Sequence, residues 1–240
     1  MTYYHTKYLK YKSKYLKLKT YLEKSQSGGD DLYITELKKL YPECVFDRGS
    51  IKDAAKYENS GYKTIYGEMD YAAIEKFNEK FNSTGNIKYF IDFGSGRGKL
   101  PLFMGDKVNK SVGIELVTER YNDAIILKEN LSKKFSEITN KVELINGDMF
   151  DYLKSVNKTT FSGPVLIWIS NLCFSEHITK KLFDELIVKM PTGSIIGSSK
   201  IPNEISSGIE PIILAGNTDD KLIVPMSWSK QSAIYLYKIK

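Results

Sequence analysis

The stretch Tyr89–Lys99 reads YFIDFGSGRGK and decides the fold. Its apolar start leads into Asp92, and three glycines follow on alternate positions, at 94, 96 and 98. Nucleotide-binding units of α/β proteins begin with an apolar strand, a glycine-rich loop and a helix, because glycine lets the backbone turn sharply and approach a ligand closely. The spacing G-x-G-x-G differs from the dinucleotide pattern G-x-G-x-x-G, and Asp92 stands where an ammonium group could bind. The plainer alternative is a tight strand-to-helix turn in another kind of α/β protein.

Length and composition fit one α/β domain with a small appendage. The chain has 240 residues, of which 12% are aromatic and can fill a sizeable core. It has no apolar run of about 18 residues and no signal-peptide pattern, so we expect neither a membrane span nor secretion. Cys44 and Cys173 fit a reducing compartment, and two histidines, His5 and His177, are too few for a histidine metal centre. These totals predict an intracellular protein without a metal site.

Basic charge is concentrated near the start of the sequence. The net charge is +6, and residues 1–24 hold seven lysines and one acid, so residues 25–240 are neutral overall. Tyrosines and leucines recur at a helical spacing in residues 1–24, which predicts a basic amphipathic helix or tail. Three roles fit: a helix on nucleic acid or chromatin, a membrane-surface helix, or a solubilising tail. Interleaved lysine and tyrosine favour a polyanion, bound through Lys7, Lys10, Lys12, Lys14, Lys17 and Lys19.

Four segments follow from these patterns: the basic helix or tail at 1–24, a flexible joint at 25–30, a small helical part at 31–83 and the main α/β domain at 84–240. The helical part is predicted to contain helices at Leu32–Leu40, which Pro42 ends, and more weakly at Ile51–Tyr57. Tyr62–Asp70 is predicted to be a loop, and Asp70 to cap a helix over Tyr71–Phe81.

The main domain alternates between apolar runs and helical patterns. Helices are predicted after Gly98, from a cap at Thr118 to about Phe135, and over Ile178–Met190. The succession of apolar runs fits a seven-stranded, mostly parallel Rossmann-like sheet with helices on both faces. Besides the run before Asp92, these runs are Ser111–Glu115, Val142–Ile145, Pro164–Ser170, Ser194–Ser198, Ile209–Ala215, Leu222–Pro225 and Ser232–Ile239.

Polar residues follow several of these predicted strands, at the sheet edge where α/β proteins bind ligands. Glu115 ends a strand 21 residues after the first glycine of the loop, where a ribose diol would be held; the alternative is a solvated surface acid. Asp148 could accept from an adenine amino group, with Met149 against the ring face. Ser170 and Asn171 end the most apolar strand.

The glycine loop with its preceding acid resembles motif I of class I S-adenosylmethionine-dependent methyltransferases. Further segments resemble, in the same order, the catalytic domain of the disruptor-of-telomeric-silencing family. Members of this family are the non-SET histone-lysine methyltransferases that act on lysine seventy-nine in the core of histone H3. The likeness covers roughly residues 62–240 and rests on Y-G-E at Tyr66–Glu68, the glycine loop at Phe90–Lys99, G-D-M-F at Gly147–Phe150, S-N-L-C-F at Ser170–Phe174, I-G-S-S-K-I-P at Ile196–Pro202, and the pair Trp228 and Tyr235.

Three positions depart from the family pattern. Met149 replaces a phenylalanine and loses a ring stack on adenine, Met69 replaces a threonine, and Ser170 replaces an asparagine. These changes concern substrate choice and the number of methyl groups added more than the identity of the cofactor.

The resemblance implies S-adenosylmethionine as cofactor, a nucleosome as partner and a monomeric enzyme. Asp92 and Glu68 would hold the methionine ammonium, while Trp228 and Tyr235 would wall a channel for the substrate lysine; core filling is the alternative for these two aromatics. The implied catalytic residues are Tyr66, Ser170, Asn171, Trp228 and Tyr235. The implied cofactor-binding residues are Tyr66, Gly67, Glu68, Met69, Asp92, Gly94, Ser95, Gly96, Gly98, Lys99, Glu115, Asp148 and Met149.

The basic segment 1–24 would then anchor the enzyme on DNA or on the acidic histone face. The implied location is the nucleus, or the site of viral DNA, because the Tyr/Leu/Lys-rich leader ending in Gly-Gly also resembles those of large nucleocytoplasmic DNA viruses.

Three alternatives stay open. An RNA or DNA methyltransferase would suit the basic segment, although amino-group methylation of bases typically uses an N-P-P-Y-like motif where this chain reads SNLC. A chromatin-binding module that has lost catalysis is permitted by the changes at Ser170 and Met149. An NAD-dependent oxidoreductase is disfavoured by the glycine spacing.

Overall fold

The computed structural model describes residues 32–42, 46–47, 65–82, 87–204, 207–212 and 221–240. The predictions for the basic segment 1–24 with its lysines, for the joint 25–30 and for the helix Ile51–Tyr57 lie outside these residues. The division into four segments therefore stays a prediction.

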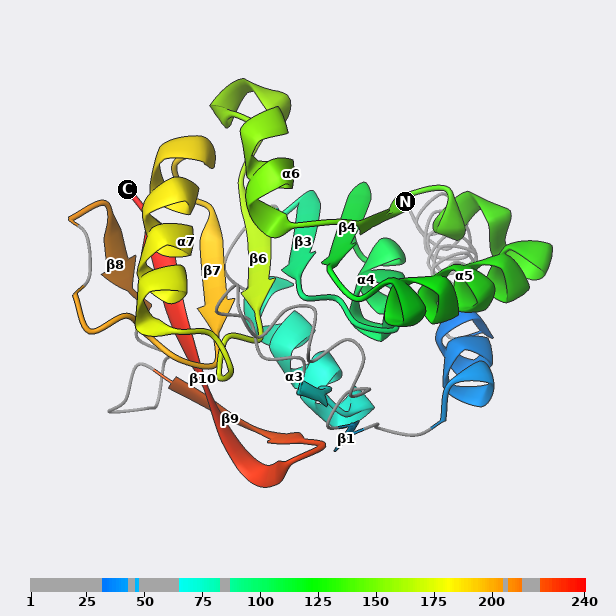
Figure 1. The fold of residues 1–240 in the computed structure, drawn as a ribbon. Helices are drawn as coiled ribbons and strands as arrows, with labels where there is room; N and C mark the ends of the chain where they lie inside the picture. Colours follow the sequence, from blue (N-terminus) through cyan, green and yellow to red (C-terminus); the bar gives the residue numbers. More distant parts are fainter. Residues whose placement is uncertain (1–31, 43–45, 48–64, 83–86, 205–206, 213–220) are drawn as a thin grey trace, which may run out of the picture.

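A mixed sheet forms the centre of the described part of the chain. Its order is β5-β4-β3-β6-β7-β10-β8, which Figure 1 shows from β4 on the right to β8 on the left. The five parallel strands are β3 (Tyr89–Phe93), β4 (Lys110–Glu115), β5 (Val142–Asn146), β6 (Val165–Ile169) and β7 (Ile195–Ser198).

The sheet ends in a long antiparallel strand, β10 (Ser229–Ile239), which pairs with β7. On its other side β10 pairs with two strands in turn, β9 (Lys221–Met226) and β8 (Ile209–Pro211). The predicted mostly parallel core is thus confirmed, and the described sheet has eight strands rather than seven because β8 and β9 share the outer side of β10.

Helices cover both faces, as predicted. One apolar cluster joins the sheet to α3 (Tyr71–Asn82), α4 (Lys99–Gly105) and α5 (Thr118–Thr139). The other joins it to α6 (Met149–Ser155) and α7 (Glu176–Lys189), and η2 is a short 3-10 turn at Lys158–Thr160. Side chains of a strand alternate between the clusters, since Phe90 lies in the first and Ile91 in the second.

The helical N-terminal part packs on the first cluster. Residues 32–40 are helical, and their Tyr33 and Leu37 are fully buried in it. The carboxylate of Asp70 accepts from the Ala73 N–H at 2.7 Å, which confirms the predicted cap of α3.

The loop predicted for Tyr62–Asp70 is wrong in its described part. Tyr66–Gly67 form strand β2, which pairs antiparallel with β1 (Phe46–Asp47), and Met69 bridges to Met226 at the end of β9. Pairing with residues distant in the sequence holds this backbone extended, so Gly67 does not break the segment into a loop. From here on, Tyr66–Met69 is called the covering segment.

Helix ends differ from prediction by a few residues. The predicted cap at Thr118 is wrong, because Val117 is the N-cap of α5 and makes no side-chain cap bond. The helix continues beyond Phe135 to Thr139, with a kink at Phe135, whose φ is −133° and ψ is 47°. The N-terminal end of α7 is capped by Ser175, which accepts from the Ile178 N–H at 3.3 Å.

Candidate functional site

The glycine loop joins β3 to α4 with positive φ angles at each of its three alternate glycines. A Cβ on Gly94 would have no atom within 4 Å, so this side of the loop faces open space. A Cβ on Gly96 would lie 2.0 Å from the Tyr66 ring. The loop therefore leaves room for a ligand at its start and lets the covering segment approach at its middle.

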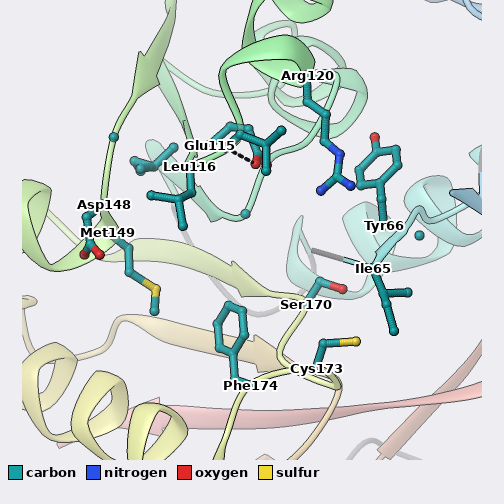
Figure 2. Close-up of a pocket in the computed structure, with 15 residues that line it drawn as sticks. Ile65, Tyr66, Glu115, Leu116, Arg120, Asp148, Met149, Ser170, Cys173 and Phe174 are labelled. Atoms are coloured by element: carbon teal, nitrogen blue, oxygen red, sulfur yellow. Dashed lines mark hydrogen bonds between the residues drawn. The ribbon is translucent and has the colours of Figure 1, made fainter. Parts of the chain in front are cut away.

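Two adjoining cavities lie at the carboxyl edge of the parallel strands, and both are bounded by Tyr66, Gly67, Gly94 and Ser170. The first extends over the ends of β4 and β5, as Figure 2 shows. The second runs beneath the covering segment toward α4. Predicted residues that line the first cavity are Tyr66, Gly67, Gly94, Glu115, Asp148, Met149 and Ser170, and those that line the second are Tyr66, Gly67, Glu68, Met69, Asp92, Gly94, Ser95, Lys99, Ser170 and Trp228.

Glu115 is a buried wall of the first cavity and not a solvated surface acid. Its carboxylate accepts from the Gly96 N–H at 2.7 Å and from the Val117 N–H at 2.8 Å. Burial raises the pKa of this carboxyl, although Val117, Arg120 and Gly96 oppose the rise. Two backbone donors thus fix a carboxylate whose two oxygens suit the two hydroxyls of a ribose.

The opposite wall of this cavity is formed by Asp148 and Met149. Asp148 is the N-cap of α6 and accepts from the Phe150 N–H at 2.7 Å. Met149 is buried beside it and presents an apolar side chain to the cavity. The helix cap fixes the carboxylate next to this apolar surface, an arrangement suited to a flat base with a polar edge.

Asp92 is the least satisfied carboxylate of the site. It is 3% exposed, and its Oδ1 has no hydrogen-bond partner among the described residues. Burial, with the nearby charge of Glu115, raises the pKa of Asp92 well above its usual value. A buried carboxylate of this kind is costly unless a cation joins it, so the second cavity offers a place for an ammonium group.

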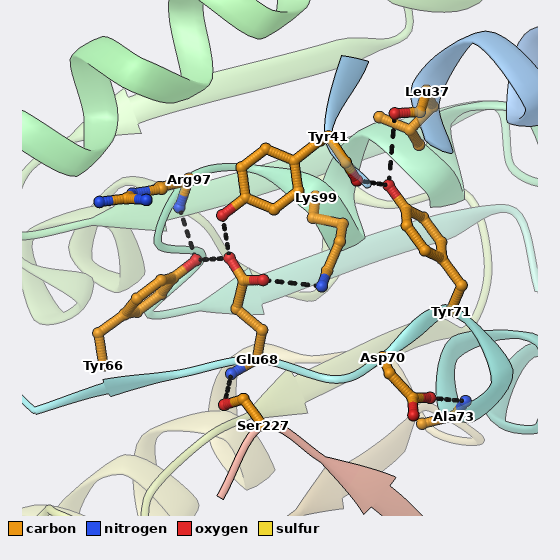
Figure 3. A network of polar contacts seen from close by, with 10 residues as sticks. All are labelled: Leu37, Tyr41, Tyr66, Glu68, Asp70, Tyr71, Ala73, Arg97, Lys99 and Ser227. Carbon is orange, nitrogen blue, oxygen red and sulfur yellow. Dashed lines mark hydrogen bonds and ion pairs between the residues drawn. The ribbon is translucent and has the colours of Figure 1, made fainter. Parts of the chain in front are cut away.

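Glu68, by contrast, is engaged by protein groups, as Figure 3 shows. Its Oε2 lies 2.7 Å from Nζ of Lys99, and its Oε1 accepts from the hydroxyls of Tyr41, at 2.6 Å, and of Tyr66. Lys99 is buried, and its ammonium lies 5.3 Å from the ring centroid of Tyr71. In this structure Asp92, rather than Glu68, is the carboxylate left for a bound ammonium.

Tyr66 covers the site from above. Its ring lies against Gly96, and its hydroxyl accepts from the Arg97 N–H at 3.1 Å. Burial, together with the charge of Glu68, raises the pKa of Tyr66 well above its usual value, so the phenol stays neutral. The neutral ring forms an apolar roof over both cavities.

Ser170 and Asn171 have different surroundings. Ser170 borders both cavities. Asn171 is fully buried, donates to the Lys200 carbonyl at 2.7 Å and accepts from the Lys200 N–H at 2.9 Å. The Asn171 amide therefore ties the end of β6 to the end of β7 and positions the edge instead of facing a ligand.

Of the two predicted channel aromatics, Trp228 lines one of the two cavities and Tyr235 does not. Trp228 lines the second cavity. Its ring packs so closely on Gly67 that a Cβ added there would lie 2.2 Å from a ring carbon. Tyr235 packs against the cluster on the other face of the sheet and lines neither cavity in the described structure. Its role in a channel stays a prediction.

Three further cavity residues were not among the predicted site residues. Arg120, in the first turn of α5, contributes a buried guanidinium to the first cavity, and Cys173 and Phe174 close its far side. Cys173 and Phe174 belong to the S-N-L-C-F segment, which was a signal for them. The signal for Arg120 was a cation in the first turn of a helix, where it opposes the helix dipole.

Two absences concern the described residues alone. Among them, no group of histidines, cysteines and carboxylates has the arrangement of a metal site. None of their helices has both the length and the apolar character that a membrane span requires.

The chain is similar to a known protein family and to solved structures. The model of the family described as "Histone methylation protein DOT1" matches residues 41–210. The structure is similar to a putative methyltransferase, yhhF, from Escherichia coli, at 12% identity and a TM-score of 0.52, over 71% of this chain and 88% of that one. It is also similar to an RNA methyltransferase from Salinibacter ruber in complex with S-adenosyl-L-homocysteine, at 16% identity and a TM-score of 0.46, over 71% and 92%. The comparison with curated proteins found no match. At 12% identity, the similarity to yhhF shows the fold alone.

Proposed function

Because the chain belongs to the DOT1 family of histone methylation proteins, we propose that it methylates the side-chain amine of a lysine in the core of nucleosomal histone H3. Lysine seventy-nine is the position that the family resemblance implies. S-adenosylmethionine is the methyl donor and, when bound, supplies an electrophilic methyl group on a sulfonium sulfur.

One structural observation supports the cofactor in this proposal: Oδ1 of Asp92 is buried without a hydrogen-bond partner among the described residues, and Asp92 lines the second cavity together with Gly94, whose Cβ position is open. An amino-acid ammonium would satisfy it, and the adjoining cavity offers Glu115 for two ribose hydroxyls. Asp148 and Met149 would hold the adenine edge and face. These residues would thus complement the ammonium, the ribose and the adenine of the cofactor.

The protein's contribution to methyl transfer is alignment and exclusion of water. Besides Asp92, where the methionine ammonium would bind, the second cavity is lined by Tyr66, Ser170 and Trp228, and a lysine approaching along these three would lose much of its hydration. Loss of hydration lowers an ammonium pKa and favours the free amine that can act as nucleophile. Its proton would leave to solvent before attack, and no dedicated general base is required.

The partner and location follow from the substrate. A nucleosomal substrate places the enzyme at chromatin, as a monomer, with the lysines of residues 1–24 on DNA or on the acidic histone face. Seven lysines in 24 residues would contribute sequence-independent affinity for a polyanion.

The test is transfer of label from S-adenosylmethionine to intact nucleosomes, free histone H3 and RNA in parallel, with Asp92→Asn as the matched control. We expect label on H3 in nucleosomes, much less on free H3, none on RNA, and near-background label with the control. Label on RNA alone would favour the nucleic-acid methyltransferase. Cofactor binding without any transfer would favour a binding module.

A further inference from the structure

Arg120 is a buried cation at the first cavity that the proposed function leaves without a role. Its side chain comes from the first turn of α5, is 8% exposed and reaches the cavity beside Glu115. The guanidinium carbon lies 4.7 Å from the centroid of the Tyr66 ring, and Figure 2 shows the two side chains next to each other.

Local structure does not favour an arginine at this position. The first turn of a helix carries a partial positive charge from its free N–H groups, which repels a cation. Burial adds a desolvation cost, because the guanidinium cannot lose its charge. Contacts outside the helix must therefore compensate, and they include the charge of Glu115 and the face of Tyr66.

The contact with Tyr66 joins two elements that are distant in sequence. Tyr66 begins the covering segment, whereas Arg120 belongs to the helix that follows β4. The Tyr66 ring also lies against Gly96, so it contacts both the glycine loop and the guanidinium. A planar cation over an aromatic ring is stabilising, and more so where water is excluded.

We propose that Arg120 is a cofactor-retaining residue, whose guanidinium clamps Tyr66 and so closes the covering segment over the first cavity. The inference rests on the proposed function only in taking S-adenosylmethionine as the ligand. Arg120 is a positioning residue, because it acts through Tyr66. It governs how long the cofactor stays bound rather than the rate of methyl transfer.

Calorimetric titration with S-adenosylmethionine, together with the dissociation rate of labelled cofactor, tests this clamp. Arg120→Ala should weaken binding about 10-fold through faster dissociation, and Arg120→Lys, which lacks the planar face, about 3-fold. Arg97→Ala is the matched control, because Arg97 lies 6.0 Å from the same ring and pairs with the half-exposed Asp123. We expect it to change affinity by less than about 2-fold.

A double-mutant comparison separates the clamp from a general structural effect. In a Tyr66→Phe background, which keeps the ring, Arg120→Ala should still cost about 10-fold. In a Tyr66→Leu background the same change should cost about 2-fold or less. If Arg120→Ala fails to fold, Arg120→Lys carries the same comparison with its smaller effect.

The outcomes are distinguishable. Equal losses in the Phe and Leu backgrounds, or unchanged affinity of Arg120→Ala beside a wild type that binds, would overturn the clamp alone. Failure of the wild type to bind S-adenosylmethionine would overturn the proposed function and the clamp together.

Discussion

At the scale of single residues, the buried carboxylate of Asp92 lowers the stability of the ligand-free protein. Asp92 carries a carboxylate, yet its Oδ1 is buried without a hydrogen-bond partner in the described structure. Burying a charged group in this way destabilises the fold unless a ligand completes it. Residues with perturbed pKa values in a cavity are characteristic of functional sites, and Asp92 fits that pattern because its pKa is raised by burial.

Asp92→Asn should therefore stabilise the ligand-free protein while impairing its function. Removing the buried charge should raise the free energy of unfolding by about 1–3 kcal/mol at pH 7, which is about 2–4 °C in Tm per kcal/mol for a chain of this size. Affinity for S-adenosylmethionine should fall about 10- to 100-fold with the loss of a charge-assisted bond. Thermal melting and calorimetry check both effects, and a lower Tm in the variant would contradict the account.

The stability of the free protein should also depend on pH through Asp92. The unfolded chain loses this proton near pH 4, whereas burial raises the pKa in the folded chain. Between the two pKa values the folded state holds the extra proton, so stability falls as pH rises through this window. In urea titrations the advantage of Asp92→Asn should be smallest near pH 4 and grow toward neutrality. A constant advantage across that range would rule out this titration as its cause.

At the scale of elements, the covering segment and α4 are joined by a buried ion pair. Glu68 and Lys99 have side chains only 5% and 3% exposed, and Tyr41 from the N-terminal helical part donates to the same carboxylate. Removing one partner of such a pair leaves the other charge buried. The pair should therefore hold the covering segment on the glycine loop.

Lys99→Met should lower the free energy of unfolding by about 3–5 kcal/mol, because Glu68 would remain buried without its cation. The double variant Lys99→Met with Glu68→Gln should recover much of that loss. Lys110→Met is the control, since its pair with Glu143 is about half exposed and should contribute at most about 1 kcal/mol. Denaturant titration measures all four proteins. If the double variant were as unstable as Lys99→Met, the buried charge would not be the cause.

Some of these elements could be predicted from the sequence and others could not. The strands β3 to β7 were predictable because each contains a short apolar run, which is continuous in β6. Asp92 and Glu115 were predictable because each lies at or near the end of such a run. Strand β2 was missed because its partners, β1 and Met226, are distant in the chain. The pairing of Glu68 with Lys99 could not be predicted either, since two opposite charges 31 residues apart carry no local pattern.

At the scale of the whole molecule, the excess basic charge and the cavities lie in different parts of the chain. Residues 25–240 are neutral overall and contain the cavities, whereas the excess of +6 lies in residues 1–24. A polyanionic partner would be attracted to such a segment by its charge. Each lysine that contacts a phosphate adds a salt-dependent contribution to affinity.

Deleting residues 1–24 should weaken nucleosome binding and make it less sensitive to salt. Each lost phosphate contact reduces the slope of log affinity against log salt by about 0.9 on duplex DNA. Binding measured at several salt concentrations checks this, with a full-length variant whose lysines at 7, 10, 12, 14, 17 and 19 are glutamine as the control for charge alone. Unchanged affinity and slope after deletion would show that the segment does not anchor the enzyme.

The most direct measurement is mass spectrometry of nucleosomes after reaction with the protein and isotopically labelled S-adenosylmethionine. The account predicts a labelled methyl group on lysine seventy-nine of histone H3, reduced to background by Asp92→Asn. Label confined to RNA or DNA, or no labelled histone lysine despite cofactor binding by the wild type, would contradict it.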